Sequence, residues 1–298
     1  MKDKQLHIVL LLLLLCDLVG SGLLWSYQWP VEPRILSVFA QGGRGNFERG
    51  IHLLASGSEV KPIEEGELIF SYLEGSSASI PYPFGSFLVL QHGSTLRSLY
   101  AHLELDNSVL NRQKTIYLKT DVLGKAGLSG ATSMGGVSLL VYDVEVEQFV
   151  NPFLLLPPVK DVSRPIIRAV RLERKGKTVS LPATEIVSRG MWEVTAEVFD
   201  LSGAVPTFWP MGVYKISVYL NGQERFMVTM DTLKEQDGMT RVFPSAGLSY
   251  DQLYYKDKEG FRIKLGTVNL NPGVLNLEIV ARDFVGNEKN QMFRFRVE

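Results

Sequence analysis

The chain has 298 residues, of which 45% are hydrophobic and 21% are charged, and its formal net charge at pH 7 is −1. This length allows two domains of ordinary size. The near-zero charge argues against a nucleic-acid-binding protein, because such proteins carry a basic surface that neutralises phosphates.

The first 26 residues have the order of features that marks a targeting segment. Two lysines precede an apolar run at residues 8–15, and small residues follow at positions 20–22. This order predicts a secretory signal peptide, and therefore export to the periplasm or cell envelope. The run is short for a membrane-spanning helix and is soon followed by Asp17. An uncleaved anchor extending to Leu24 stays open, and membrane attachment is expected only through this segment.

Cys16 is the only cysteine, and it lies within this leader. The sequence Leu14-Leu15-Cys16 has a faint likeness to a lipoprotein box, in which the cysteine carries a lipid, but Leu15 is bulkier than the small residue usual before it. Cleavage after Gly22 would leave the mature chain without cysteine. An exported protein without disulfides has to rely on the size of its core, which this length permits.

Two segments follow the leader, residues 27–158 and 163–298, joined by a linker at 159–162 directly after Pro157-Pro158. A Pro-Pro pair continues neither a helix nor a central strand. Both segments show the short apolar runs and turn residues of β-strands, and no long stretch has helical periodicity. We therefore expect an all-β fold class, with an antiparallel β-sheet domain followed by a β-sandwich.

Stretches that alternate apolar and polar residues occur in the second segment at 192–198, 214–220 and 275–281. The stretch at 214–220 ends in Asn221-Gly222, a strong hairpin signal. Two of the strands run into Asp-x-x-Gly turns, in which the carboxylate accepts backbone N–H bonds. The segment resembles the immunoglobulin-like (Ig-like) modules of bacterial exported proteins, and a resemblance of this kind says little about function.

The first segment contains a series of short motifs in a defined order. They are Trp29-Pro30, Phe39, Val60-Lys61-Pro62 with Gly66, the run from Phe84 to Gly93, Ser98-Leu99-Tyr100-Ala101-His102-Leu103, the run from Val122 to Gly130, and Asn151-Pro152. In order and spacing, residues 29–156 resemble the lysostaphin/LytM family of zinc endopeptidases, which cut peptidoglycan cross-bridges. The resemblance implies a LytM-like antiparallel β-sheet domain.

The resemblance also implies where a metal site would lie. In that family zinc is held by the His and Asp of a His-x-Gly-x-Asp motif and by the second His of a His-x-His motif, which leaves a position for water. The first His of that pair and the His of a Tyr-x-His-Leu motif handle protons at the scissile amide. In this chain Glu48 replaces the first ligand and His52 replaces the Asp, whereas His102 stands in its family position.

The strand that corresponds to His-x-His contains no histidine. The preferred alignment places Leu139 and Val141 at the two histidine positions, and an alignment shifted by one residue places Ser138 and Leu140 there. Asp143 lies two residues past Val141, on the same face of a strand. Neither alignment supplies the missing ligand, although Asp143 is a candidate substitute.

Two interpretations of Glu48 and His52 therefore stay open. With Asp143 they form an altered zinc site, or they are polar residues that line a former groove. His102 either hydrogen-bonds a peptide in that groove or is retained for packing. His92 stands beside a hairpin glycine and is expected as a turn residue, with the groove as its alternative.

We expect a non-catalytic LytM-like protein of the cell envelope, a pseudoenzyme without a cofactor, that binds a peptidoglycan peptide or regulates a cell-wall hydrolase. The groove candidates are Glu48, His52, His92, His102 and Asp143. The Ig-like module would position the groove or recruit a partner through a sheet edge. The alternatives are an active zinc metalloendopeptidase that uses Glu48, His52 and Asp143, and a structural envelope protein whose groove has no ligand.

Overall fold

The computed structural model describes residues 27–43, 45–75, 82–105, 114–205, 208–244, 247–255 and 261–298. The predicted leader, including Cys16 and its signal-peptide, anchor and lipid alternatives, lies outside these residues. In the part of the chain that the structure describes, no helix is long and apolar enough to span a membrane.

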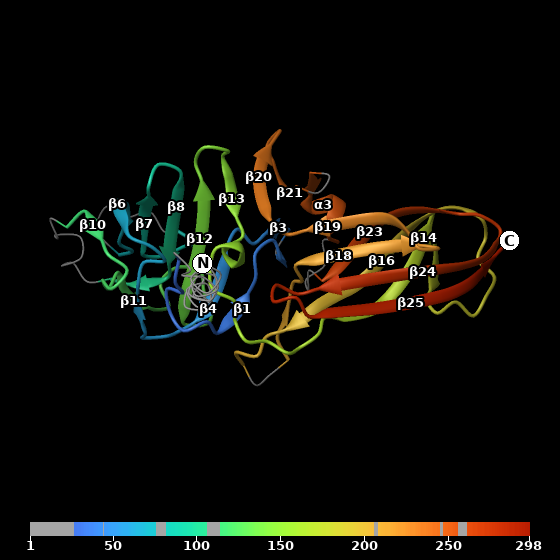
Figure 1. Cartoon of the computed structure of the whole chain (residues 1–298), viewed down its shortest axis with the longest axis horizontal. Coiled ribbons are helices and arrows are strands. Elements are labelled where there is room, and N and C mark those ends of the chain that lie inside the picture. Colours follow the sequence, from blue (N-terminus) through green and yellow to red (C-terminus); the bar gives the residue numbers. More distant parts are fainter. Residues whose placement is uncertain are drawn as a thin grey trace, which may run out of the picture.

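Antiparallel strands make up almost all of the fold, which confirms the all-β prediction. Figure 1 shows an elongated molecule, with the strands of the first segment at one end and the C-terminus at the other. Among the described residues the helical elements are the 3-10 turn η1 (Pro152–Leu154) and the one-turn helix α3 (Tyr250–Leu253).

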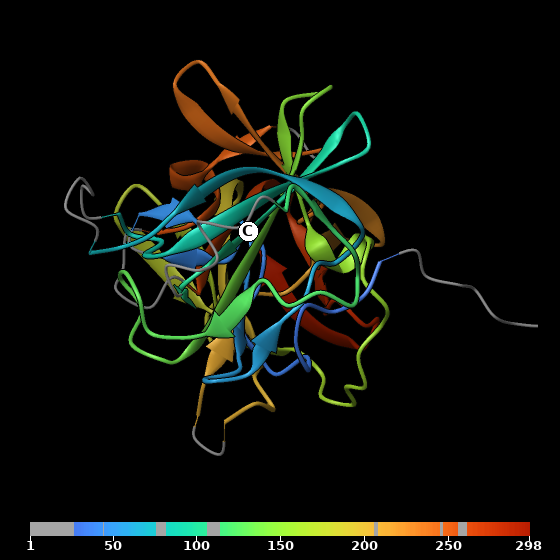
Figure 2. The same cartoon turned by 90° about the vertical axis from the view of Figure 1, so that its left-hand side faces the viewer.

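The largest sheet has eleven strands, and its main path is β10-β6-β7-β8-β12-β13-β20-β21-β22. Off this path, β4 pairs with β12, and β1 pairs with β4. The strands are β1 (Ile35–Ser37), β4 (Ile51–Leu54), β6 (Gly66–Tyr72), β7 (Phe87–His92), β8 (Leu96–Ala101), β10 (Ile116–Tyr117), β12 (Gly136–Asp143), β13 (Gln148–Val150), β20 (Thr232–Gln236), β21 (Met239–Phe243) and β22 (Leu248–Ser249). The hairpins β7–β8, β12–β13 and β20–β21 stand side by side (Figures 1 and 2).

Two small sheets complete the first segment. They contain β5 (Glu59–Val60), β11 (Gly124–Ala126) and β9 (Leu103–Glu104) in one, and β2 (Gly42–Gly43) with β3 (Asn46–Phe47) in the other. His102 directly precedes β9, and Gly127 directly follows β11. Gly127 N donates to His102 O at 2.9 Å, so the pairing of these two strands extends to the backbone of His102.

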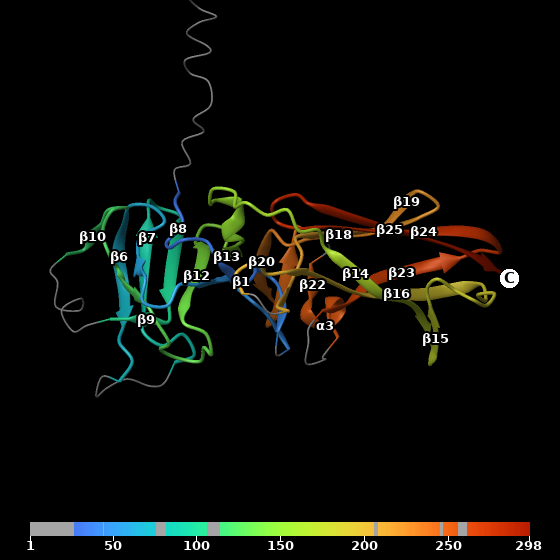
Figure 3. The ribbon, with the colours of Figure 1, turned by 90° about the horizontal axis from the view of Figure 1, so that it is seen from below.

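The second segment forms two further sheets, which Figure 3 shows as two layers. One contains β14 (Ile166–Arg174), β15 (Lys177–Ser180), β16 (Gly190–Leu201), β17 (Pro210–Met211) and β23 (Arg262–Leu270). The other contains β18 (Lys215–Leu220), β19 (Gln223–Thr229), β24 (Gly273–Arg282) and β25 (Glu288–Val297). Alternate residues such as Trp192, Val194, Leu277 and Ile279 are buried between the layers, as the period of a strand requires. The Ig-like assignment of this sandwich stays a prediction.

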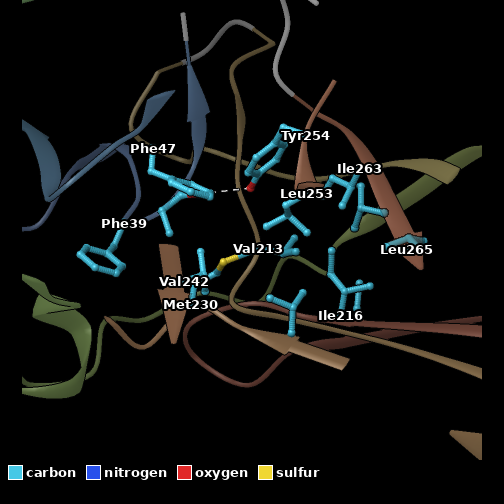
Figure 4. Packing of buried hydrophobic residues seen from close by; sticks show 14 of the residues in the cluster. Phe39, Phe47, Val213, Ile216, Met230, Val242, Leu253, Tyr254, Ile263 and Leu265 are labelled. Atoms are coloured by element: carbon cyan, nitrogen blue, oxygen red, sulfur yellow. Dashed lines mark hydrogen bonds between the residues drawn. The ribbon is translucent and has the colours of Figure 1, made fainter. Parts of the chain in front are cut away.

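The two segments share a sheet, which the sequence did not predict. Strand β20 of the second segment pairs with β13 of the first, with Val150 opposite Thr232 and Gln148 opposite Lys234. A continuous hydrophobic core also joins the segments: Figure 4 shows Phe47 beside Tyr254, and their ring centroids lie 5.9 Å apart. The linker at 159–162 therefore connects two segments that are packed against each other.

Asn151, which is fully buried, ties β13 to the second segment. Its Nδ2 donates to Met230 O at 2.7 Å, and its Oδ1 accepts from Phe153 N at 3.1 Å as the N-cap of η1. Asn151 N also donates to Asp231 O at 2.9 Å. One side chain thus satisfies backbone groups on both sides of the junction.

Replacing Asn151 by Ala should lower the free energy of unfolding by about 2–4 kcal/mol, because it leaves a buried carbonyl and a buried N–H without partners. Urea unfolding followed by tryptophan fluorescence measures this change, and one transition is expected because the segments share a core. The matched control is Asn276→Ala, at an exposed position, which should change stability by less than about 0.5 kcal/mol. A similar small loss for both variants would contradict the assigned role of Asn151.

Candidate functional site

A cleft of about 360 Å³ opens where β4, β12 and the end of β8 meet. Residues from all three strand regions line it, including Glu48, His52, Phe84, His102, Ser138 and Leu140. The pairing of β4 with β12 places His52 opposite Ser138. The structure therefore brings together three of the five groove candidates, Glu48, His52 and His102.

The preferred alignment of the His-x-His strand is not the observed one. Leu139 and Val141 are fully buried in the core, whereas Ser138 and Leu140 line the cleft. Successive strand residues face opposite sides, so a shift of one residue exchanges the core face and the cleft face. The core requires the apolar set Val137, Leu139 and Val141, which leaves Ser138 and Leu140 for the cleft.

Close contact between β4 and β12 depends on two glycines. A Cβ atom at Gly50 would lie 2.3 Å from Leu139 O, and one at Gly136 would lie 2.1 Å from Leu53 O and 2.9 Å from His52 Nε2. No larger residue fits at these distances. Gly50 is the central glycine of the first motif, so its retention has a packing reason that is independent of any metal.

Both ring nitrogens of His52 have partners within the protein. Nδ1 lies 2.9 Å from Ser138 Oγ, and Nε2 lies 3.3 Å from Met134 O. A carbonyl only accepts, so in the neutral ring Nε2–H donates to Met134 O and Nδ1 accepts from the Ser138 hydroxyl. Burial, and secondly the neighbouring His102, lower the pKa of His52 to about 4, against the opposing effect of the Met134 bond. His52 is thus a neutral ring fixed in the cleft wall.

His102 is held differently. Its Nδ1–H donates to Ser129 O at 2.8 Å, which leaves Nε2 as an acceptor, and no bond within the described residues engages Nε2. Burial lowers the pKa of His102, although the Ser129 bond and Glu74 oppose this effect. The backbone of His102 has φ +64°, a conformation that costs energy in a non-glycine residue. Its ring centroid lies 5.6 Å from that of His52, in an edge-to-face arrangement.

Glu48 and Arg49 form the rim of the cleft. Glu48 is exposed, and its backbone pairs with the preceding loop through Ala40 N and Gln41 O. Arg49 reaches the second segment, where Nη2 lies 2.5 Å from Glu235 Oε1 and 3.3 Å from Thr240 Oγ1. The β20–β21 hairpin therefore contacts the segment that carries Glu48 and His52.

His92 and Asp143 lie outside the cleft. His92 is the last residue of β7 and is buried, with Nδ1 2.8 Å from Glu65 O and Nε2 2.7 Å from Ser98 Oγ. Both contacts are internal, so His92 has a structural role and is not an exposed turn residue. Asp143 Oδ1 accepts from Glu145 N at 2.9 Å in the turn after β12, on the face opposite that of Ser138. It is not available to complete a site with Glu48 and His52.

The residues of the cleft do not match a three-ligand zinc site. Among the described residues, three ligand atoms of His, Cys, Asp or Glu come within 4.8 Å of one another only at Asp161, Asp200 and Asp283, in the linker and sandwich. Glu48, His52 and His102 do not meet this condition, and Ser138 and Leu140 add neither imidazole nor carboxylate. The cleft presents an imidazole acceptor on His102 and the hydroxyl oxygen of Ser138 beside the apolar side chain of Leu140.

The fold and the site thus define an all-β protein with a histidine-containing cleft on a large antiparallel sheet. Similar solved structures are M23-type peptidases. A zinc-containing peptidase of Vibrio cholerae has 15% identity over 40% of this chain and 37% of its own, with a TM-score of 0.31. The catalytic domain of the prophage-encoded M23 protein EnpA of Enterococcus faecalis has 20% identity over 43% of this chain and 95% of its own, with a TM-score of 0.33. The catalytic domain of lysostaphin from Staphylococcus simulans has 17% identity over 39% of this chain and 86% of its own, with a TM-score of 0.32.

This chain therefore matches less than half the length of the Vibrio cholerae peptidase. A protein-family model matches residues 164–298, which is less than half of the chain. No curated protein matches.

The lowered pKa of His52 predicts an acid-sensitive fold. Between the unfolded value of 6.5 and the folded value of about 4, the unfolded chain binds a proton that the folded chain does not. The free energy of unfolding therefore falls as pH falls through this range, by about 2–3 kcal/mol from this residue. His52→Gln keeps a donor for Met134 O but does not titrate, so its stability should fall less than that of the unchanged chain. Urea unfolding at about pH 7 and about pH 4.5 measures the difference; equal losses would contradict the assignment.

Proposed function

We propose that the chain is a non-catalytic LytM-like protein, exported to the cell envelope, whose cleft binds an extended peptide of peptidoglycan. The observation that supports this most strongly is the arrangement of imidazoles. His52 is bonded within the protein on both ring nitrogens, whereas His102 keeps Nε2 as an acceptor. A peptide N–H is a donor that matches this acceptor.

The remaining lining fits a peptide in the same way. Ser138 provides a hydroxyl oxygen beside His52, and Leu140 provides an apolar surface. A neutral hydrogen bond of this kind contributes on the order of 1 kcal/mol, so several are needed together. The β-rich surroundings suit an extended ligand, because backbone groups of a strand are spaced to pair with it.

Hydrolysis by zinc is not supported by the same residues. A zinc peptidase needs three protein ligands and an open position for water. Asp143 lies on the face of β12 opposite the cleft, which separates it from Glu48 and His52, and the cleft face of that strand presents Ser138 and Leu140. The proposal therefore assigns binding, and no reaction, to the cleft.

Binding should depend on His102 Nε2. His102→Asn keeps an amide donor for Ser129 O and tolerates positive φ, but it removes the Nε2 acceptor, so affinity for a stem peptide from purified cell wall should fall about five- to tenfold. His102→Gln is the matched variant, because its side-chain oxygen reaches the Nε2 position, and it should retain more affinity. Isothermal titration of the folded variants measures both values. Unchanged affinity in His102→Asn, or no binding by the unchanged chain, would refute peptide binding in this cleft.

The absence of a zinc site can be tested by rebuilding one. The unchanged chain should bind zinc far below one ion per molecule and release no fragments from peptidoglycan. One variant combines four substitutions: Glu48→His, His52→Asp, Ser138→His and Leu140→His. It restores the His-x-Gly-x-Asp and His-x-His side chains of the LytM family on the cleft face, so it should bind zinc. The matched control carries Leu139→His and Val141→His instead and should bind none and lose stability, because those positions face the core. Metal analysis after dialysis distinguishes the variants, and one zinc per unchanged chain together with fragment release would overturn the proposal.

A further inference from the structure

Five aromatic rings form a cluster beside the cleft, and none of them belongs to the continuous hydrophobic core. Phe87 is at its centre and is buried. Its ring centroid lies 5.6 Å from that of Phe70 and 5.5 Å from that of Tyr72, both stacked, and 5.9 Å from Tyr82 and 6.2 Å from Phe84. We call these five residues the aromatic platform.

Much of the platform is in contact with solvent. Phe70 is 53% exposed and Tyr82 is 50% exposed, and the adjoining Ile69 on β6 is 42% exposed. Exposed apolar surface that is gathered in one place marks an interaction site more often than scattered single residues do. The cluster buries Phe87 but leaves Phe70 and Tyr82 about half exposed, so much of its aromatic surface is not used in packing.

The platform is continuous with the cleft and fixed relative to His102. Phe84 belongs to both, since its ring contacts Phe87 and also lines the cleft, and Phe84 O accepts from His102 N at 2.8 Å. Two residues after Phe84, Ser86 N donates to Ser129 Oγ at 3.0 Å. A Cβ atom at Gly85 would lie 2.3 Å from the carbonyl carbon of Ser129, so the two chain segments are in direct contact. A ligand that occupies the cleft and extends past Phe84 reaches the platform.

The chemistry of the platform selects its occupant. Its five side chains carry no charge, which does not suit a charged polymer. The faces of aromatic rings are electron-rich, whereas the C–H groups on one face of a pyranose ring are electron-poor, so sugar rings stack on such faces. The exposed Tyr82 adds a hydroxyl group, which matches the hydroxyls of a sugar. We propose that the aromatic platform binds pyranose rings of the glycan strand to which the cleft-bound peptide is attached; this extends the proposed function, and rests on it.

The experiment compares three probes: the stem peptide alone, glycan strands stripped of peptide, and the intact disaccharide-peptide. Phe70→Ala and Tyr82→Ala should each weaken binding of the two sugar-containing probes about five- to tenfold and leave binding of the stem peptide unchanged. The matched control is Phe208→Ala, which removes an aromatic ring that is 63% exposed in the second segment. It should alter none of the three affinities. Thermal unfolding of each variant verifies that it is folded, and the two platform variants test the same surface independently.

The outcomes separate this proposal from the proposed function. Loss of sugar binding in both platform variants, with the peptide affinity retained, supports the platform. If sugar-containing probes bind all variants equally, the platform proposal fails while peptide binding in the cleft stands. If stripped glycan binds and the stem peptide does not, the proposed function fails and the platform stands as a glycan site. Altered self-association of Phe70→Ala in sedimentation, without any change in sugar binding, would reassign the surface to a second copy of the chain.

Discussion

The alternation of residues along β12 is the constraint on which both the core and the cleft depend. This strand pairs with β4, β8 and β13, so its position is determined from both edges. Val137, Leu139 and Val141 are all fully buried and define the core face. Ser138 and Leu140 are thereby committed to the cleft face, because a strand cannot send neighbouring residues to one side. The hydrophobic core thus decides which side chains meet His52.

The second segment supports this arrangement by adding strands to the same sheet. Strand β20 pairs with β13, and Arg49 bridges from the cleft rim to Glu235. The ion pair is exposed and contributes little stability by itself. Strand pairing and the buried contact of Phe47 with Tyr254 have the larger effect, because they remove backbone groups and apolar surface from water. The second segment is therefore packed against the part of the chain that carries the cleft, although the described residues that line the cleft all belong to the first segment.

The two cleft histidines show how similar residues acquire different roles. Both are neutral because burial disfavours the charged imidazolium. His52 is satisfied by Ser138 and Met134, whereas His102 donates through Nδ1 and keeps Nε2 as an acceptor. A carbonyl bond of this kind orients an imidazole for a ligand on its other nitrogen. The proposed binding of a peptide and its glycan depends on this difference and on the uncharged aromatic platform beside the cleft.

The sequence by itself determined the all-β class, the β7–β8 hairpin and the grouping of Glu48, His52 and His102 in one groove. These features depend on local alternation, on turn residues and on ordered motifs, which can be read without knowing tertiary contacts. Only the tertiary structure decided the register of β12, the structural role of His92, the removal of Asp143 from the groove and the pairing of β13 with β20. Two of these depend on partners far away in the chain: His92 bonds to Glu65, 27 residues earlier, and β13 pairs with a strand about 80 residues later. As a pattern, either Leu139 and Val141 or Ser138 and Leu140 could have faced the cleft. The core selected the second pair for the cleft, because the other choice would have exposed Leu139 and Val141 to water.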